Sequence, residues 1–273
     1  MDFRAGPKRR LKQGMTNFIY LLYGTGEDCY LEAAYSIGTL KKWFNPASAR
    51  IIVFTDQPGK IKDWPVVCES ITGELAAMRG RTNFNHRAKL GVILKCFGKY
   101  PGNVIYLDSD TIIRGDIAAL AGRLASGTAI MHIFESRNPF SELSGFEARL
   151  SDRVVYRYSP DSWMYNAGVI GIHHTNQFLV GRALELCDAL LDFGSRKHTV
   201  EQFSISETLR ISDVKILEAH RMVAHYVSHK PYVHEKISEM IRKTGKPAWA
   251  FERDVSYSYL WAYWLKKLGF YRE

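Results

Sequence analysis

The feature that most constrains the fold is an apolar, β-branched run at residues 104–107, which ends in two aspartates, Asp108 and Asp110, separated by one serine. Such a run, following turn residues at 101–103, is typical of a buried strand. Side chains alternate along a strand, so those of Asp108 and Asp110 point the same way. A divalent cation with oxygen ligands would stabilise this pair of like charges. The alternative is that the two aspartates cap a following turn or helix.

The remainder of the chain alternates between strand-like and helix-like segments, which predicts an α/β fold. We expect strands at residues 17–23, 50–56, 66–68, 128–133, 165–172 and 222–226, and helices at 28–43, 86–97, 176–193 and from 199 onward. The segment 135–162 has weak periodicity and is expected to be an insertion over the active face. Ligands of open α/β sheets bind beyond the carboxyl ends of strands, where the two aspartates lie.

Length and composition fit one large domain, with 273 residues of which 46% are hydrophobic and 24% charged. We divide the chain into a flexible basic arm at 1–16, one domain at 17–248 and a C-terminal helical tail at 249–273. The tail is rich in aromatic and basic residues. It is either an interfacial helix that touches an anionic membrane or a helix packed on the domain.

The net charge and the cysteines indicate which partners and which cellular compartment to expect. The net charge of +9 indicates an anionic partner: a nucleotide, a nucleic acid or an acidic membrane face. No apolar run approaches the roughly 18–20 residues that span a bilayer, and the basic start is not followed by the apolar stretch of a secretory signal. Four cysteines without a CxxC pair fit a reducing cytosol.

Two segments before the aspartates are candidates for binding a nucleotide. The loop after the first strand, with Tyr23 and Thr25, is not GxGxxG, so hydride chemistry on a dinucleotide is not supported, but it can admit a base and a ribose. Asp56 ends the second strand and either accepts from a uracil imide or forms an Asx-turn. Arg87 and Lys89 begin a helix, and they either reach phosphates or belong to a solvated basic face.

Two further candidates lie after residue 220. His225 ends a short strand and is a candidate nitrogen ligand for the cation at the two aspartates. Lys230, five residues later, can neutralise phosphate charge beside it. Other histidines crowd this region, so a structural role for His225 is the alternative.

Five short motifs along the chain together carry a resemblance to a known family. The motifs YLDSDT at 106–111, YNAGVIG at 165–171, EQ at 201–202, HY at 225–226 and KPY at 230–232 follow one another in order. Together they resemble the GT-A glycosyltransferases, in particular the glycogenin and bacterial lipooligosaccharide galactosyltransferase type (family 8-like). The resemblance covers roughly residues 17–232. It implies a GT-A fold, a Rossmann-like mixed sheet flanked by helices, and a UDP-sugar donor whose diphosphate is bridged to the aspartates by Mn²⁺ or Mg²⁺.

The resemblance also implies roles for individual residues. The metal ligands would be Asp108, Asp110 and His225, with Asp108 also reaching the ribose. The uridine side would be Tyr23, Thr25 and Asp56, and Lys230 would contact the β-phosphate. Asn166 and Gly168 would line the sugar pocket, and Gln202 would lie near the anomeric carbon with Glu201 beside it.

The sequence departs from the family pattern at three places. The usual Asp-Gln pair is Glu201-Gln202 here, and the tryptophan of the Lys-Pro-Trp motif is Tyr232. The glycine between the histidine and Lys-Pro is replaced by Ser228-His229, with a spacer one residue short. Whether His225 or His229 is the third metal ligand therefore stays open, as does retention of anomeric configuration.

The expected function is a metal-dependent hexosyltransferase that uses a nucleotide-sugar donor. The acceptor would be a hydroxyl of a bacterial surface glycan or glycolipid, and the enzyme would be cytoplasmic and peripheral on the inner membrane face. One alternative is a nucleotidyltransferase, against which the absence of cations in the loop at 23–27 counts. The other is a nucleic-acid-binding module, against which the absence of a recognised motif counts, so we expect no nucleic-acid partner.

Overall fold

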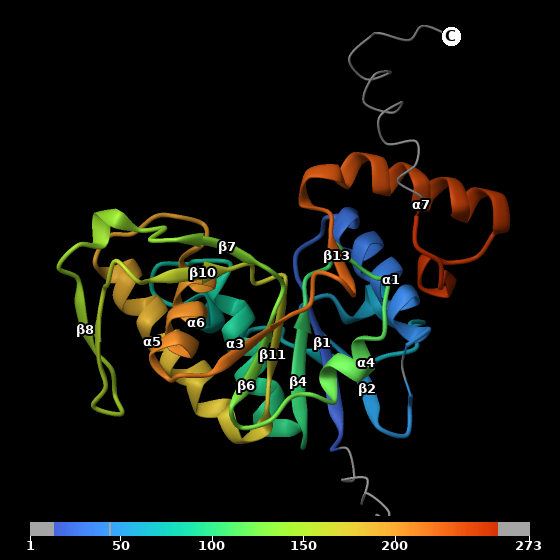
Figure 1. The fold of residues 1–273 in the computed structure, drawn as a ribbon. Helices are drawn as coiled ribbons and strands as arrows, with labels where there is room; N and C mark the ends of the chain where they lie inside the picture. Colours follow the sequence, from blue (N-terminus) through green and yellow to red (C-terminus); the bar gives the residue numbers. More distant parts are fainter. Residues whose placement is uncertain (1–13, 44, 256–273) are drawn as a thin grey trace, which may run out of the picture.

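The computed structural model describes residues 14–43 and 45–255. Seven strands form one sheet in the order β12-β6-β11-β4-β1-β2-β3 (Figure 1). Their bounds are β1 Thr16–Leu22, β2 Ala49–Thr55, β3 Val67–Ser70, β4 Asn103–Leu107, β6 Thr128–Met131, β11 Val169–Ile172 and β12 Lys215–Glu218. Strand β11 is antiparallel to both neighbours, β4 and β6, whereas the other neighbouring pairs are parallel. The expected mixed α/β sheet is therefore confirmed.

Helices cover both faces of this sheet (Figure 1). They are α1 Glu27–Lys41, α2 Leu75–Arg79, α3 Arg87–Lys99, α4 Ile117–Ala121, α5 Gln177–Asp192, α6 Val200–Ile211 and α7 Lys230–Thr244, with 3₁₀ turns at Pro58–Ile61, Ser141–Leu143, His174–Asn176, Val227–His229 and Ala248–Ala250. None of the helices within the described part of the chain is long and apolar enough to cross a membrane.

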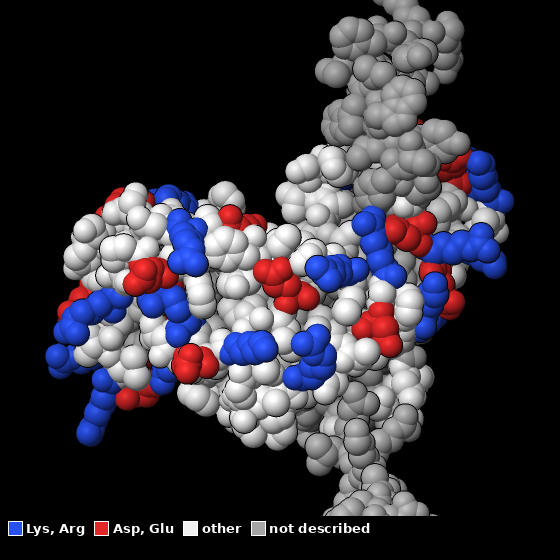
Figure 2. Space-filling model, viewed as in Figure 1, with Lys and Arg blue, Asp and Glu red and all other residues white. Residues whose placement is uncertain are grey.

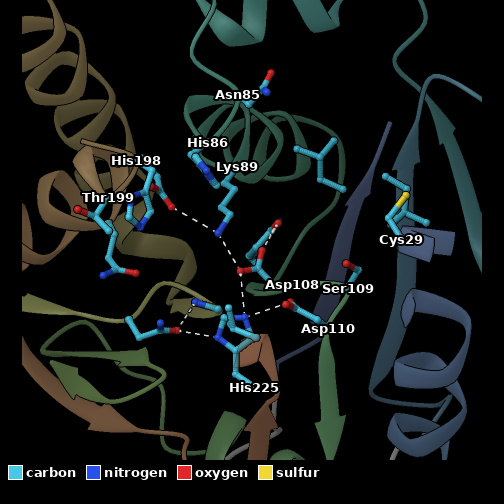
Figure 3. A pocket seen from close by; sticks show the side chains of 18 of the residues that line it. Cys29, Asn85, His86, Lys89, Asp108, Ser109, Asp110, His198, Thr199 and His225 are labelled. Carbon is cyan, nitrogen blue, oxygen red and sulfur yellow. Dashed lines mark hydrogen bonds and ion pairs between the residues drawn. The ribbon is translucent and has the colours of Figure 1, made fainter. Parts of the chain in front are cut away.

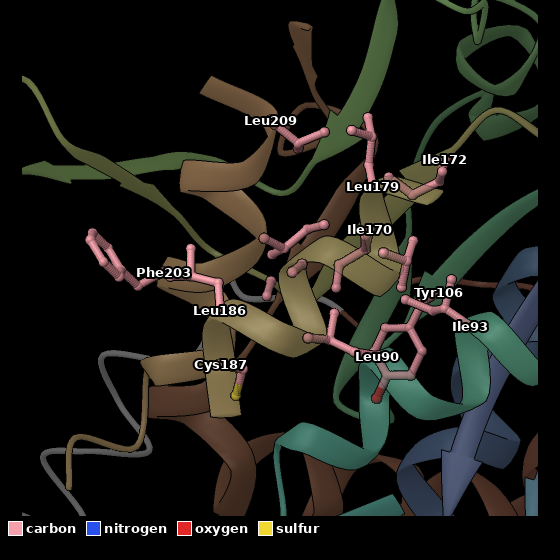
Figure 4. Close-up of a cluster of buried hydrophobic side chains, with 14 of the residues drawn as sticks. Leu90, Ile93, Tyr106, Ile170, Ile172, Leu179, Leu186, Cys187, Phe203 and Leu209 are labelled. Atoms are coloured by element: carbon pink, nitrogen blue, oxygen red, sulfur yellow. The ribbon is translucent and has the colours of Figure 1, made fainter. Parts of the chain in front are cut away.

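Strand β4 divides the core between the two faces. Val104 and Tyr106 pack on α3 and α5, whereas Ile105 and Leu107 pack on the side of α1 and α4. Figure 4 shows the first of these clusters, in which Tyr106 lies beside Leu90. Because each of these β4 side chains is buried, no register shift of the strand is tolerated, and the strand end that carries the aspartates is fixed.

Three small two-stranded sheets complete the fold. Strand β5 (Thr111–Ile113) pairs antiparallel with β13 (Val223–His225), β7 (Phe134–Arg137) with β10 (Trp163–Tyr165), and β8 (Glu147–Arg149) with β9 (Val155–Arg157). The first of these sheets matters for the site, because its register sets His225 opposite Thr111. It thereby brings two segments that are 115 residues apart to the same sheet edge.

Several elements differ from the sequence-based expectation. The strand expected at 165–172 is two strands, β10 and β11, because a turn at 166–168 separates them. Strands β5 and β12 and helix α7 were not expected at all. The weakly periodic segment 135–162 contains β8, β9 and most of β7. Its buried side chains belong to the core cluster that also contains α5 and α6.

The two predicted terminal segments fall mostly outside the described residues. Thr16, the last residue of the predicted basic arm, begins β1 and pairs with Ala49 and Asn103. At the other end, 249–255 pack against α1: a Cβ built on Gly38 would lie 2.4 Å from the backbone oxygen of Phe251. The aromatic and basic positions beyond residue 255 lie outside the described residues.

Candidate metal and ligand site

A pocket of about 680 Å³ opens at the carboxyl ends of β1 and β4. Its floor comes from the residues that end these strands, and its walls come from the first turns of α3 and α6, the turn at 166–168 and the segment 225–230. Figure 3 shows that Lys89 and His225, which come from two of these segments, point toward Asp108 and Asp110. The pocket therefore lies where the topology of the sheet predicts a ligand site.

Asp108, Asp110 and His225 form the centre of the pocket. One ligand atom of each lies within 4.8 Å of the other two. The His225 Nε2 atom is 3.0 Å from Oδ1 of Asp110 and 3.8 Å from Oδ2 of Asp108. Asp110 is buried and the other two are partly buried. Of the two histidines considered as the third ligand, His225 lines the pocket and His229 does not.

Two lysines flank this centre from opposite sides. Lys89 Nζ lies 2.8 Å from Oδ2 of Asp108 and 3.4 Å from Glu201, and Lys230 Nζ lies 3.0 Å from Oδ2 of Asp110. Tyr106 donates a further hydrogen bond of 2.8 Å to Oδ1 of Asp108. Both oxygens of each aspartate thus have a partner: Tyr106 and Lys89 for Asp108, and His225 and Lys230 for Asp110.

The electrostatics of the site follow from these contacts. Burial alone would raise the pKa of Asp110, but the hydrogen bond and charge of His225 and the charge of Lys230 outweigh it and hold that pKa well below its usual range. Burial raises the pKa of Glu201, although the charge of Lys89 opposes this effect. Four carboxylates and two lysines line the pocket, which leaves a formal charge of −2 when its histidines are neutral.

The donor set fits a divalent cation. Two carboxylates and one imidazole, mutually within 4.8 Å, offer hard oxygen ligands and one borderline nitrogen, a combination that suits a divalent metal ion. The formal charge of the lining residues is also the charge that such an ion balances. The group can therefore hold a metal ion, and the expectation of a metal site at Asp108, Asp110 and His225 is supported by the geometry.

The turn at 166–168 lies directly against His225. The Asn166 Oδ1 atom accepts from the Gly168 N–H at 2.9 Å and lies 3.0 Å from His225 Nδ1. Asn166 Nδ2 donates to Glu135 at 2.8 Å, and Gln202 Nε2 donates to the other Glu135 oxygen at 2.6 Å. The Oε1 atom of Gln202 accepts from the Ala167 N–H at 3.0 Å.

Not all of the expected nucleotide contacts lie in the pocket. Tyr23 and Lys89 line it, as do Asp108 and Lys230, whereas Thr25, Asp56 and Arg87 do not. Asp56 instead accepts from the Gly24 N–H at 3.0 and 3.2 Å, and so holds the loop after β1 in place. This contact joins residues 32 positions apart, so it is neither the expected base contact nor the Asx-turn that was the alternative.

The predicted phosphate contact of Arg87 is not supported. Its guanidinium forms a bidentate ion pair with Asp188 on α5, at 2.6 and 2.8 Å, and donates to the carbonyl oxygen of Met78. Arg87 and Lys89 are two residues apart, roughly half a turn of helix, so only one of them lies on the side of α3 that faces the pocket. Lys89 is on that side.

Several residues of the site were not identified from the sequence. They are Glu32 and Ser109, which contact each other beside Lys230, and Glu135, Asn85, His86, His198 and Thr199, which line the pocket. A signal existed for Ser109, the residue between the two aspartates. For the others, no local pattern marks a single acid or histidine as part of a site.

No protein-family model matches this sequence, and a search among curated proteins finds no significant match.

Proposed function

We propose that this protein is a metal-dependent glycosyltransferase that uses a nucleotide-sugar donor, most simply a UDP-sugar. The observation that carries the proposal is the meeting of Asp108, Asp110 and His225 with Lys230 in one pocket at the carboxyl ends of β1 and β4. These side chains come from segments that are far apart in the sequence. They match the metal and phosphate positions that the family resemblance assigns, and the mixed sheet is compatible with the proposed GT-A fold.

In this proposal Asp108, Asp110 and His225 hold the cation. A bound Mn²⁺ or Mg²⁺ supplies charge that stabilises the departing diphosphate. Lys230 adds a second positive charge on the same side, and its ammonium is accessible to a phosphate because its side chain is 38% exposed. Charge that develops on a leaving group is stabilised best by groups already fixed in place, and Lys230 is fixed by two carboxylates.

The sugar side of the pocket is formed by Asn166, Gly168 and Gln202 together with Glu135. Glu201 is buried and paired with Lys89, which makes it a poor acceptor of a proton from an incoming hydroxyl. Glu135 is exposed at the pocket wall and is the more accessible carboxylate for that role. Gln202 is held by Ala167 and Glu135, so its position beside the reacting sugar is set by the protein.

The proposed acceptor is a hydroxyl of a bacterial surface glycan or glycolipid, reached from the cytoplasmic side of the membrane.

Figure 2 shows that on the face containing the hollow, acidic and basic side chains are interspersed among the described residues. This face therefore lacks the continuous basic stripe that binding a nucleic-acid backbone calls for.

The test is to incubate the protein with a panel of nucleotide sugars and glycan acceptors and to measure nucleoside diphosphate release with and without Mn²⁺. We expect metal-dependent release of UDP. Asp110→Asn removes one ligand charge at nearly constant shape and should abolish release, whereas Asp63→Asn, at an exposed position away from the pocket, should not change it.

Two results would contradict the proposal. One is the absence of any metal-dependent nucleotide binding by the wild-type protein. The other is release of pyrophosphate from nucleoside triphosphates, which would indicate a nucleotidyltransferase instead.

A further inference from the structure

A chain of hydrogen bonds leads from the sugar side of the pocket to the histidine of the metal site. It runs from Gln202 to Glu135, from Glu135 to Asn166 and from Asn166 to His225, with donor–acceptor distances of 2.6, 2.8 and 3.0 Å. The four residues come from α6, β7, the turn at 166–168 and β13. The family resemblance gives Asn166 and Gln202 sugar contacts, and it gives Glu135 no role.

The direction of each hydrogen bond in this chain is fixed by chemistry. A carboxylate only accepts, so the Asn166 amide must present its NH₂ group to Glu135. The other end of the same amide is then the oxygen, and this assignment agrees with the backbone N–H of Gly168, which donates to that oxygen. Two independent neighbours therefore orient Asn166 in the same way.

The orientation of Asn166 determines which nitrogen of His225 carries a proton. The Asn166 oxygen faces Nδ1, so Nδ1 must be the donor, and in a neutral ring the lone pair is then on Nε2. Nε2 is the atom that lies 3.0 Å from Asp110 and 3.8 Å from Asp108. Because a carboxylate only accepts, Nε2 donates to Asp110 across this contact. A metal ion at this position takes the place of that Nε2 proton, whereas Nδ1 keeps its proton for Asn166.

We propose that Asn166 and Glu135 are positioning residues that hold His225 with its proton on Nδ1 and thereby direct Nε2 to the metal. The inference rests on the metal site proposed above. In metal sites, partners of this kind, one shell removed from the ion, orient the ring, and their loss typically weakens metal binding by about 10–100-fold. Asn166 then acts mainly through His225, because its oxygen already accepts two hydrogen bonds from the protein.

The chain also links the sugar pocket to the metal. Gln202 donates to the same Glu135 carboxylate that orients Asn166, so a sugar that displaces the Gln202 amide changes the partner of Glu135. The chain Gln202–Glu135–Asn166–His225 in this way connects the sugar of the donor with the metal that holds the diphosphate.

A reciprocal exchange of the two polar groups tests the inference. Asn166→Asp alone places two carboxylates 2.8 Å apart, and Glu135→Gln alone places an amide where only an acceptor fits both neighbours. In the double variant Asn166→Asp/Glu135→Gln the carboxylate is at position 166 and the amide is at position 135. The amide at position 135 donates to the carboxylate at position 166 and accepts from Gln202, so every donor again has an acceptor. The total charge is unchanged.

The quantity to measure is the dissociation constant of Mn²⁺ alone, from the electron paramagnetic resonance signal of the free ion. We expect each single variant to bind Mn²⁺ about 10–100-fold more weakly, and the double variant to return to the wild-type value or bind more tightly. Melting temperatures show whether each variant is folded. Equal affinity in all four proteins, or an additive loss in the double variant, would overturn the inference.

A spectroscopic measurement tests the tautomer directly. With Zn²⁺ as a diamagnetic probe, long-range ¹⁵N correlation spectra should show a proton on Nδ1 of His225 and the metal on Nε2, with the resonance assigned by its loss in His225→Gln. Metal on Nδ1 would refute the role of Asn166 while leaving the metal site and the proposed function intact. Absence of metal binding by the wild-type protein would overturn both proposals.

Discussion

Gly168 lies in contact with His225: a Cβ atom built on Gly168 would be 2.4 Å from Nδ1 of that histidine and 2.9 Å from Oδ1 of Asn166. The position therefore admits only glycine, and the reason is close approach of a ring to the backbone rather than an unusual φ angle. Because the same imidazole faces Asp110 on its other side, the glycine fixes how far the ring can be from the proposed ion.

Gly168→Ala should displace His225 and weaken Mn²⁺ binding by about 10-fold or more, since a ligand that leaves its position removes one of three bonds to the ion. The control is Gly181→Ala on α5, where a Cβ meets nothing within 4 Å. That substitution should leave Mn²⁺ affinity unchanged and raise the free energy of unfolding by about 0.5–1 kcal/mol. Calorimetric titration with Mn²⁺ measures the affinity of both variants. Unaltered affinity in Gly168→Ala would contradict the assigned contact.

Glu32 on α1 holds Lys230, the lysine that we propose contacts a phosphate. Its buried carboxylate lies 3.0 Å from Lys230 Nζ and also accepts from Ser109 at 2.8 Å, and it lies 2.8 Å from His234 Nε2. Removing the charge by Glu32→Gln frees the lysine from one of its two carboxylate partners. The lysine then loses its fixed position, although it remains present.

We expect Glu32→Gln to weaken binding of UDP with Mn²⁺ by about tenfold, because a hydrogen bond to a charged group contributes about 1.5–3 kcal/mol when it is well positioned. Binding of UMP, which lacks the β-phosphate, should change less. Asp28→Asn, one turn earlier on α1 and 82% exposed, is the matched control. Equal losses for UDP and UMP would indicate a general structural defect and would exclude a specific effect on Lys230.

Metal binding should depend on pH through His225. Burial alone would lower the pKa of this histidine, but the hydrogen bond to Asp110 and the charge of Asp108 outweigh it, so the pKa is raised above its usual value. A proton on Nε2 competes with the ion, so Mn²⁺ affinity is greatest at a pH above the raised pKa. It should fall by up to about tenfold per pH unit as the pH drops below that pKa.

The variant His225→Gln provides the control for this pH dependence. Glutamine does not titrate, so its Mn²⁺ affinity should be weaker than that of the wild type but nearly constant over the same pH range. Titrations at a series of pH values show the difference. A wild-type profile as flat as that of His225→Gln would argue against His225 as a ligand.

The part of the site that was predictable from the sequence is the part that local pattern controls. An apolar strand that ends in Asp108 and Asp110 specifies both the position and the direction of those side chains. Their place at the carboxyl end of a strand in an α/β sheet predicts that a ligand binds there. His225 was less certain, because its position depends on pairing between β5 and β13, two strands of only three residues each. Such short strands have no recognisable alternation.

Other parts depended on contacts between distant segments. Arg87 and Lys89 are both basic residues in the first turn of one helix, so the sequence does not distinguish them. The orientation of that helix in the fold places Arg87 against Asp188 and Lys89 against Asp108. Glu32 and Glu135 are single acids in unremarkable surroundings. Helix α7 could have been recognised, since Pro231 fits a first helical turn and Gly245, in the left-handed region, ends the helix.

The segment between β7 and β10 is anchored by one buried acid, Glu207 on α6. Its carboxylate accepts from Tyr156 and Ser162, from the Trp163 N–H and from the guanidinium of Arg210, at 2.7–3.1 Å. The side chain is completely buried. Every one of these donors would lose its partner if the carboxylate were removed, and buried donors without partners are costly.

Glu207→Gln should therefore lower the free energy of unfolding by about 3 kcal/mol, as expected when one member of a buried ion pair is removed. The comparison is Glu147→Gln in the same segment, whose partner Arg157 is 71% exposed and whose loss should cost less than about 1 kcal/mol. Urea denaturation of both variants measures the difference, provided that the slopes agree with that of the wild type. Similar losses in the two variants would mean that Glu207 does not anchor the segment, and that its packing rests on the apolar contacts of its buried side chains.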